Sequence, residues 1–583
     1  KPASRAYPAL IKSVPTFSQK MPTGLTGEAV TGFGDLVLDN SNGIPSKGAG
    51  ELALDSWLRV RWNRSFIRLY LGDPSWPRHD FRAVIVGRIG RPTTPSATTL
   101  SFKIQNLSSA FNVPLTTQKF ASGQFIGAYK PVLIGAFNGN YGTFPPLFFG
   151  AFVEPPMSDK TALVFSINDG PFNYTEGTSL SPTVFDNLKF IGTQSGLATT
   201  AVNTTTGLLT VPSHGMVLNY RVRFTFANFI SPPAGFSQNV DYFVIASGLT
   251  INDFKLSATP GGGAIIPTSA TTGTAVDGFG YSFNTTAGTM TLVTPPVGRV
   301  TLSNIAQTDA SNFDNLFRRS GLSLDFKEQA SFTAYASVIY GYGGLFYQPG
   351  SVTLSQAFID HATGTQSWYG FTPDGLMRVG FIALPTSTPV MTFNSADYKN
   401  QTLKMADEIP AIDFTKAQLT YAKWFLAAGP FQSTDARATQ GKTYYSIPGT
   451  SADYATYGDL PIDNRPDRTD ADVSTNFDLI SPDYQRPNQI VTLYLQRLGI
   501  FEVPVRLRAL ELTIGDTISL TDDRFGFRQW TSGAPASPDN TATIDSRLCV
   551  VIGIDVNLNG GPFPVTLTLM RRVPGYYPAA DLT

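Results

Sequence analysis

The chain has 583 residues, and its 43 lysines and arginines balance its 43 aspartates and glutamates, so the formal net charge is zero. Charged residues make up only 15% of the chain, against about a quarter in a typical globular protein. A neutral chain that is 42% apolar is not a disordered one, and it has no overall charge to draw it to nucleic acid or to a membrane. No uninterrupted apolar run reaches the ~18 residues that span a bilayer, so we expect a soluble, globular protein.

Short apolar runs alternate with turns made by the 53 glycines and 42 prolines, which is typical of a β-rich fold. In residues 1–186 this pattern predicts strands at 34–40 and 65–72, and we interpret the segment as an N-terminal β domain. Between residues 57 and 91 eight arginines face only Asp73 and Asp80. The local charge of this stretch is therefore about +6.

From residue 187 the composition changes to Thr, Ala, Gly and Ser with few charges. Strand-like alternation persists at 220–226 and 240–246, so residues 187–300 are predicted to form an inserted β module. A small α+β domain is expected at 301–389, because residues 351–361 have the pattern of a short helix begun by a Ser or Thr cap.

Residues 390–583 return to strand patterns and are predicted to form a C-terminal β domain. A helix is predicted at 413–424, and strands are predicted at 490–495, 501–508, 515–520 and 565–569. Between the helix and the strands, residues 451–483 carry eight aspartates against two arginines. This acidic stretch has a local charge of about −6.

Motifs that would carry catalysis or hold a cofactor are absent from the sequence: there is no nucleophile elbow, phosphate loop, HExxH or dinucleotide fingerprint. The pattern Asp470-x-Asp472-x-Ser474 resembles the start of a calcium loop, but Thr475 stands where the loop needs Gly, so we interpret it as a solvated loop. We predict a protein without catalytic residues, cofactor or metal, and not an enzyme.

Cysteine and histidine are too sparse for a disulfide framework or a metal cluster. Cys549 lies in an apolar run and is predicted to be a buried strand residue. His214 follows Pro212-Ser213 in a turn, and His361 ends the helix predicted at 351–361. We interpret both histidines as structural.

The arginine-rich stretch could bind phosphates, since aromatic residues that can stack on bases lie among the arginines. An acidic stretch of matching charge exists in the same chain, however, so we favour contact between subunits. The predicted interface pairs Arg59, Arg61, Arg64 and Arg68 with Asp463, Asp467, Asp470 and Asp472.

Three segments in order resemble the baseplate hub or tail-tip proteins of long-tailed, siphovirus-like bacteriophages and gene transfer agents. They are residues 30–43, the stretch 331–380 with its "aromatic, x, Asp-Gly, x, apolar" strand pair, and residues 510–569 with a Gly-Asp turn. The resemblance covers about two thirds of the chain. It implies a mainly β, multidomain fold in which 1–186 and 390–583 are tail-tube-like β-barrels, joined by the small α+β domain and carrying the inserted module. Some gene-transfer-agent hubs hold an iron–sulfur centre, which the single Cys549 cannot build.

The resemblance implies a structural virion protein of the tail baseplate or tip, assembled in the bacterial cytoplasm. The resemblance also implies a homo-oligomer, a trimer, that forms a hub ring connecting the tail tube to the tip. Its implied neighbours are distal tail and tube proteins, the tape measure protein, and fibre or tip proteins. DNA would contact it only in transit through the channel.

Residues 197–275 separately resemble a small β domain of phage tail and fibre proteins, marked by Ser213-His-Gly215 and Gly261-Gly-Gly-Ala264. By resemblance this module decorates the outside and contacts neighbours or host surface glycans. Two alternatives follow: a carbohydrate-binding adhesin of the tail tip, and a polysaccharide hydrolase. In the adhesin, Tyr242, Phe243 and Trp368 are the aromatic side chains expected to contact sugars.

Overall fold

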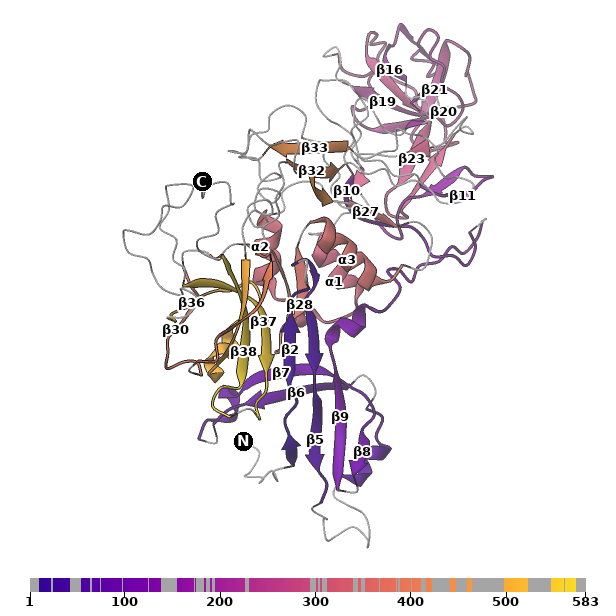
Figure 1. The fold of residues 1–583 in the computed structure, drawn as a ribbon. Coiled ribbons are helices and arrows are strands. Elements are labelled where there is room, and N and C mark those ends of the chain that lie inside the picture. The colour runs from indigo at the N-terminus through magenta and orange to yellow at the C-terminus, as the bar shows by residue number, and fades with distance from the viewer. Residues whose placement is uncertain are drawn as a thin grey trace, which may run out of the picture.

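The computed structural model describes residues 10–41, 54–137, 155–171, 194–225, 230–293, 312–338, 352–409, 498–522 and 547–572, with short gaps inside these ranges, and nine short strands between them. Figure 1 shows two large sheets at the base, a group of helices above them, and a smaller β module held away from both. The mainly β, multidomain class is confirmed. In the described residues the strands form open sheets and no closed barrel, unlike the two barrels implied by the resemblance.

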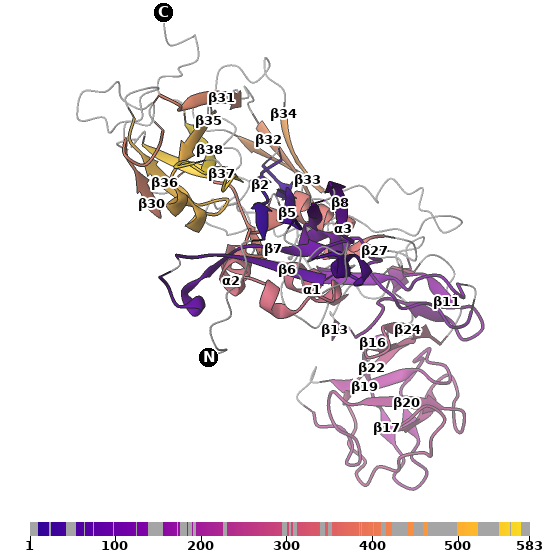
Figure 2. The same cartoon turned by 90° about the horizontal axis from the view of Figure 1, so that it is seen from below.

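The first sheet has six strands in the order β1-β5-β9-β7-β6, with β8 paired to β9. Its strands are β1 (Ile11–Ser13), β5 (Asp35–Asp39), β6 (Ser65–Leu71), β7 (Arg82–Ile89), β8 (Thr93–Ser96) and β9 (Thr99–Gln105). Alternation puts Leu36, Leu100 and Phe102 into one core, where Trp62 meets the ring of Phe102 edge-on at 5.4 Å. Strands β6 and β7 form a long hairpin, and β6 is the edge of the sheet (Figure 2).

The second large sheet has eight strands in the order β30-β36-β37-β38-β35-β31, with β2 and β4 attached to β37. Its strands are β2 (Phe17–Lys20), β4 (Val30–Phe33), β30 (Met391–Phe393), β31 (Lys404–Ile409), β35 (Leu498–Val505), β36 (Thr517–Leu520), β37 (Leu548–Val556) and β38 (Val565–Arg572). Strand β37 is buried along almost its whole length, and Cys549 is a fully buried free thiol in it, as predicted.

The N-terminal segment joins the two halves of the molecule. Strand β2 pairs with both β37 and β4, and β3 (Gly27–Glu28) adds in parallel to β28 (Trp368–Phe371). The side chain of Gln19 donates a buried hydrogen bond of 3.0 Å to the carbonyl of Phe371. Residues that are more than 300 positions apart in the chain thus share one backbone network.

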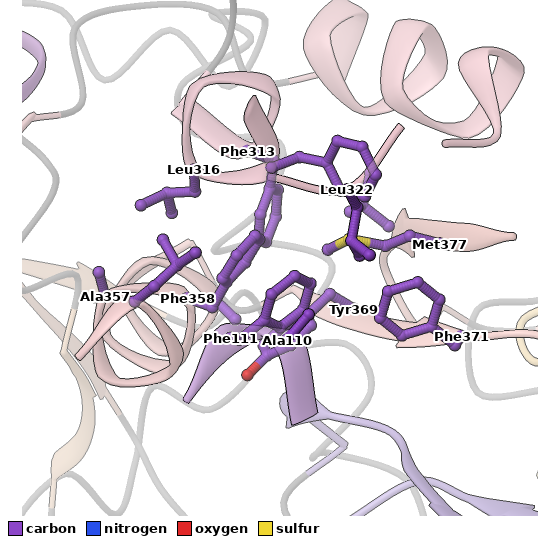
Figure 3. Packing of buried hydrophobic residues seen from close by; sticks show 14 of the residues in the cluster. Ala110, Phe111, Phe313, Leu316, Leu322, Ala357, Phe358, Tyr369, Phe371 and Met377 are labelled. Carbon is purple, nitrogen blue, oxygen red and sulfur yellow. The ribbon is translucent and has the colours of Figure 1, made fainter. Parts of the chain in front are cut away.

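The helical layer contains α1 (Asn312–Arg319), α2 (Gln329–Val338) and α3 (Leu354–Gly364). The predicted helix start is confirmed, because Thr353 caps α3 by accepting a hydrogen bond from the backbone N–H of Gln356. Figure 3 shows Phe111, Phe313 and Phe358 packed together beside Tyr369, Phe371 and Met377 of the hairpin of β28 and β29 (Met377–Gly380). Short 3-10 helices complete the body: η1 (Asp55–Arg59), η2 (Arg78–Asp80), η3 (Leu107–Phe111), η5 (Leu324–Phe326) and η8 (Leu507–Glu511).

Two carboxylates anchor α1 to its surroundings. Asp314 accepts hydrogen bonds from Arg318 and from Lys327, and Arg319 holds Asp169 through two bonds of 2.7 and 2.9 Å. Burial alone would raise the pKa of each carboxyl, but these hydrogen bonds and positive charges outweigh it and hold both pKa values below the usual range. The helix is therefore tied by charge as well as by its apolar face.

A ladder of outgoing and returning strands carries the inserted module. Strand β10 (Val132–Phe137) pairs with β27 (Gly344–Tyr347) and with β26 (Ile305–Ala306), which also pairs with β13 (Asn173–Tyr174). Strand β14 (Thr183–Val184) pairs with β15 (Lys189–Phe190) and β25 (Val300–Thr301). Strand β12 (Val164–Ser166) pairs with β11 (Met157–Asp159) and with β24 (Thr289–Leu292), and β24 pairs with β23 (Tyr281–Asn284). We call these strands the stalk. Because the outgoing strands β10, β12, β13 and β14 each pair with a returning one, the module sits at the far end of a double connection (Figure 1).

The module is a seven-stranded antiparallel sheet in the order β16-β22-β19-β20-β21-β18-β17. Its strands are β16 (Gln194–Ala198), β17 (Ala201–Val202), β18 (Leu209–Thr210), β19 (Arg221–Thr225), β20 (Asp241–Ile245), β21 (Asp253–Ser257) and β22 (Ala275–Phe279). Its own core, with Val222, Phe224 and Phe254 fully buried, is separate from those of the body. The four-way domain division predicted from the sequence stays a prediction.

The helix predicted at 413–424 is wrong. Residues Lys416–Tyr421 form strand β32, which pairs with β33 (Gly441–Ser446) and β34 (Asp459–Asp463). The run Ala-Gln-Leu-Thr-Tyr also alternates with period two, and two partner strands favour that reading over a weak helical period. The strand predicted at 490–495 lies outside the described residues.

We expect Gln19→Leu to destabilise the body by about 1 kcal/mol, because the carbonyl of Phe371 loses one of its two side-chain donors and keeps the hydrogen bond of 3.2 Å from the Thr31 hydroxyl. The neighbouring Lys20 makes only an exposed ion pair with Asp555, so Lys20→Ala should change stability by less than about 0.5 kcal/mol. Urea unfolding followed by tryptophan fluorescence measures both. Equal effects of the two variants would contradict the importance of this junction.

Candidate functional site

One face of the β6–β7 hairpin is exposed and both aromatic and basic. Along β6 the side chains of Phe66, Arg68 and Tyr70 point outward, while Ile67 and Leu69 pack against the core of the first sheet. Phe66 and Tyr70 are 48% and 52% exposed. The period-two alternation of the sequence Ser-Phe-Ile-Arg-Leu-Tyr-Leu dictates this division of the strand into two faces.

The predicted interface arginines lie partly on this hairpin and next to it. Arg59 ends η1, Arg61 follows it, and Arg68 lies on β6, and all three are exposed. Arg64 is outside the described residues, as are three of the predicted partners, Asp467, Asp470 and Asp472. Asp463 is the last residue of β34. The predicted pairing of the basic and acidic stretches therefore stays a prediction.

Two other arginines of the basic stretch have partners within the chain. Arg82 forms an ion pair with Glu511 of η8, and the guanidinium of Arg88 lies 5.4 Å from the ring centre of Phe66. The first contact connects the hairpin to the C-terminal sheet domain. Two of the positively charged side chains of the stretch therefore make their contacts within the protomer.

Two of the three predicted sugar contacts are buried. Trp368 is 4% exposed in a core with Ile514 and Val550, and Tyr242 is 6% exposed, with its hydroxyl accepting a hydrogen bond from the backbone of Ser237. A ring without an exposed face cannot stack on a sugar, so the expectation is corrected for these two residues. Phe243 is half-buried on β20 and stays a prediction.

A buried arginine fixes the module to the stalk. Arg221 and Arg223 of β19 both form ion pairs with Asp241 of β20, and the Arg221 guanidinium lies 5.3 Å from the ring centre of Tyr281. Tyr281 begins β23 of the stalk, directly after the last strand of the module. This contact limits rotation of the module about its connection.

His214 and His361 are buried and serve packing, as the sequence predicts. His361 lies in the last turn of α3, is 1% exposed, and is 3.0 Å from the hydroxyl of Tyr335. His214 is equally buried, and its Nδ1 accepts a hydrogen bond of 2.9 Å from the backbone N–H of Met216. Burial lowers the pKa of His214, and hydrogen bonds to the backbone of Asp253 and Thr250 offset this only in part.

Within the part of the chain that the structure describes, no group of three or more His, Cys, Asp or Glu side chains could hold a metal ion. The calcium-like pattern at 470–476 lies outside that part. No helix of the described residues is long and apolar enough to cross a membrane. The features that the described residues offer are exposed surfaces and contacts between parts of the chain.

No family model matches the chain, and no curated protein matches it. Among solved structures it is similar to the tail protein from Neisseria meningitidis MC58, with 13% identity and a TM-score of 0.22 over 66% of this chain and 97% of that one. It is also similar to the prophage MuSo2 43 kDa tail protein from Shewanella oneidensis (10%, 0.22, 65% and 93%) and to a virion of a native gene transfer agent particle (12%, 0.25, 79% and 88%). Likenesses this low carry no argument about function.

We expect the module to lose stability as the pH falls below about 6.5, the ordinary pKa of histidine. The folded module disfavours protonation of His214 and the unfolded chain does not, so the unfolded state binds the extra proton. His214→Asn keeps an acceptor for the Met216 N–H and does not titrate. Hydrogen exchange of β20 and β21, corrected for intrinsic rates, should accelerate in acid in the wild type and not in this variant; equal acceleration in both would contradict the assignment.

Proposed function

We propose that this chain is a structural protein of a phage-type tail, located in the virion. In this proposal three copies form a hub ring that joins the tail tube to the tip and lines the path of the DNA. Tube, tape measure and fibre or tip proteins are its neighbours, and it catalyses no reaction. The stalk carries the module outward from the ring.

The observation that carries the proposal is the interlocking of the three segments that resemble hub proteins. Strand β4 lies in the first of these segments, β28 and β29 in the second, and β36 to β38 in the third. The residues just before the first segment connect all three by backbone hydrogen bonds: Ala29 donates to the carbonyl of Tyr369 at 2.7 Å, and β2 pairs with both β4 and β37. The three segments are far apart in the sequence but lie in one connected body of the structure.

The two large sheets also suit a ring that has three-fold symmetry by protomer and approximate six-fold symmetry by sheet. Each protomer supplies two β units, so three protomers supply six such units around an axis. This is the arrangement needed between a six-fold tube and a three-fold tip. In this proposal the exposed arginines beside and on the hairpin contact the acidic stretch of a neighbouring protomer, which makes each contact heterologous.

We expect the purified wild-type chain to form trimers by native mass spectrometry. Arg59→Glu, Arg61→Glu and Arg68→Glu combined should leave monomers with an unchanged melting temperature, because repulsion replaces attraction at an exposed surface.

The control carries the same change in charge at exposed lysines away from the hairpin, Lys119→Glu, Lys160→Glu and Lys399→Glu, and should remain trimeric. A monomeric wild type would contradict the ring. Trimers of the arginine variant would discard the predicted pairing while leaving the ring intact.

A further inference from the structure

A large open groove lies between the hairpin and the C-terminal sheet domain. Its volume is about 1460 Å³. The hairpin forms one wall, η8 forms the other, and the turn between β28 and β29 with part of η5 forms the floor. Pockets for single small molecules are typically about 300–1,000 Å³, so this groove has room for an extended chain.

Two aromatic rings stand exposed in this groove. Tyr70 is 52% exposed on β6, and Trp76 is 50% exposed in the turn that follows. Asp73 holds that turn, because its carboxylate accepts hydrogen bonds from the backbone and hydroxyl of Ser75 and its carbonyl accepts one from the N–H of Trp76. Phe81 packs so closely against Gly72 that a Cβ there would lie 2.4 Å from its ring. Trp76 is thus presented by a fixed turn, and Tyr70 by the strand that leads into it.

The charges in the groove exclude a polyanion as its preferred ligand. Arg68, Arg82 and Arg508 line it. Five carboxyl side chains line it as well: Asp73, Asp80, Asp325, Asp374 and Glu511. Among the lining side chains that the structure describes, with His79 counted as neutral, three positive against five negative charges give a formal charge of −2. Nucleic acid binding would need an excess of positive charge, so the local charge of the groove argues against the phosphate-binding interpretation of this arginine-rich stretch.

We propose that this groove binds a neutral polysaccharide chain. Flat rings with an exposed face pack against the C–H faces of pyranose sugars, whose weakly positive hydrogens meet the negative face of the ring. Carboxylates accept hydrogen bonds from sugar hydroxyls, and arginines donate to sugar oxygens. Such a ligand requires exposed aromatic rings with hydrogen-bond acceptors and donors between them, and this groove has all three. The site is in the body of the protein and does not involve the module.

The test uses isothermal titration calorimetry of the full chain with three neutral hexasaccharides, derived from chitin, cellulose and amylose. We expect at least one to bind, and Tyr70→Ala and Trp76→Ala each to weaken its binding about tenfold, the effect of losing one stacked ring. Trp76→Phe keeps a ring and should retain most of the affinity. Ile251→Ala, which removes an exposed apolar side chain of the module, should bind as the wild type does.

Four outcomes would overturn the proposal. The first is no heat of binding from any of the three sugars. The second is binding that the two ring variants leave unchanged, which would place the sugar elsewhere. The third is tighter binding of a single-stranded oligonucleotide than of every sugar, which would make the groove a nucleic-acid site. The fourth is loss of self-association in Trp76→Ala, which would make the groove a contact between copies of the chain. Sugar binding does not depend on the ring, so its failure leaves the hub proposal untouched.

Discussion

The architecture depends on a short N-terminal segment that is inserted between parts of the chain encoded hundreds of residues later. Strand β2 completes the C-terminal sheet at β37, β3 extends the β28–β29 hairpin, and β4 continues toward the first sheet. Every one of these contacts is a backbone ladder, with Gln19 adding a side-chain bond. Without this segment the two large sheets would lose their backbone connection, and side-chain contacts such as the core around Trp368 and the Arg82–Glu511 ion pair would be left to join them.

Around this junction, each part of the molecule is fixed by a different interaction. Aromatic packing of Phe111, Phe313 and Phe358 holds the helices, and the ion pairs of Asp314 with Lys327 and of Asp169 with Arg319 fix α1. At the far end of the stalk, Arg221 fixes the module. The body is therefore stiff where the resemblance to hub proteins lies, while the module is a separately cored unit on a narrow double connection. A stiff body with a separate module suits the proposed ring, in which the body would bear load and the module would project outward.

Local patterns predicted local structure well. Alternation identified β5, β6, β20 and β38, a Thr cap identified α3, and an apolar run identified the burial of Cys549. The same rule could not separate a strand from a helix at 416–421, where both periods fit. Nor could it distinguish which aromatic side chains are exposed: Trp368 and Tyr242 are buried by partners remote in sequence, while Tyr70 and Trp76 project from a hairpin. Pairings over more than 300 residues leave no mark in a single sequence.

The hub proposal is tested most directly by cryo-EM of intact tail ends from particles that carry this chain, reconstructed without imposed symmetry. We expect three copies around the axis directly below the tube, with the two large sheets of each copy facing the channel and the stalk pointing outward. Copies confined to peripheral fibres, or particles that lack the chain, would contradict the account.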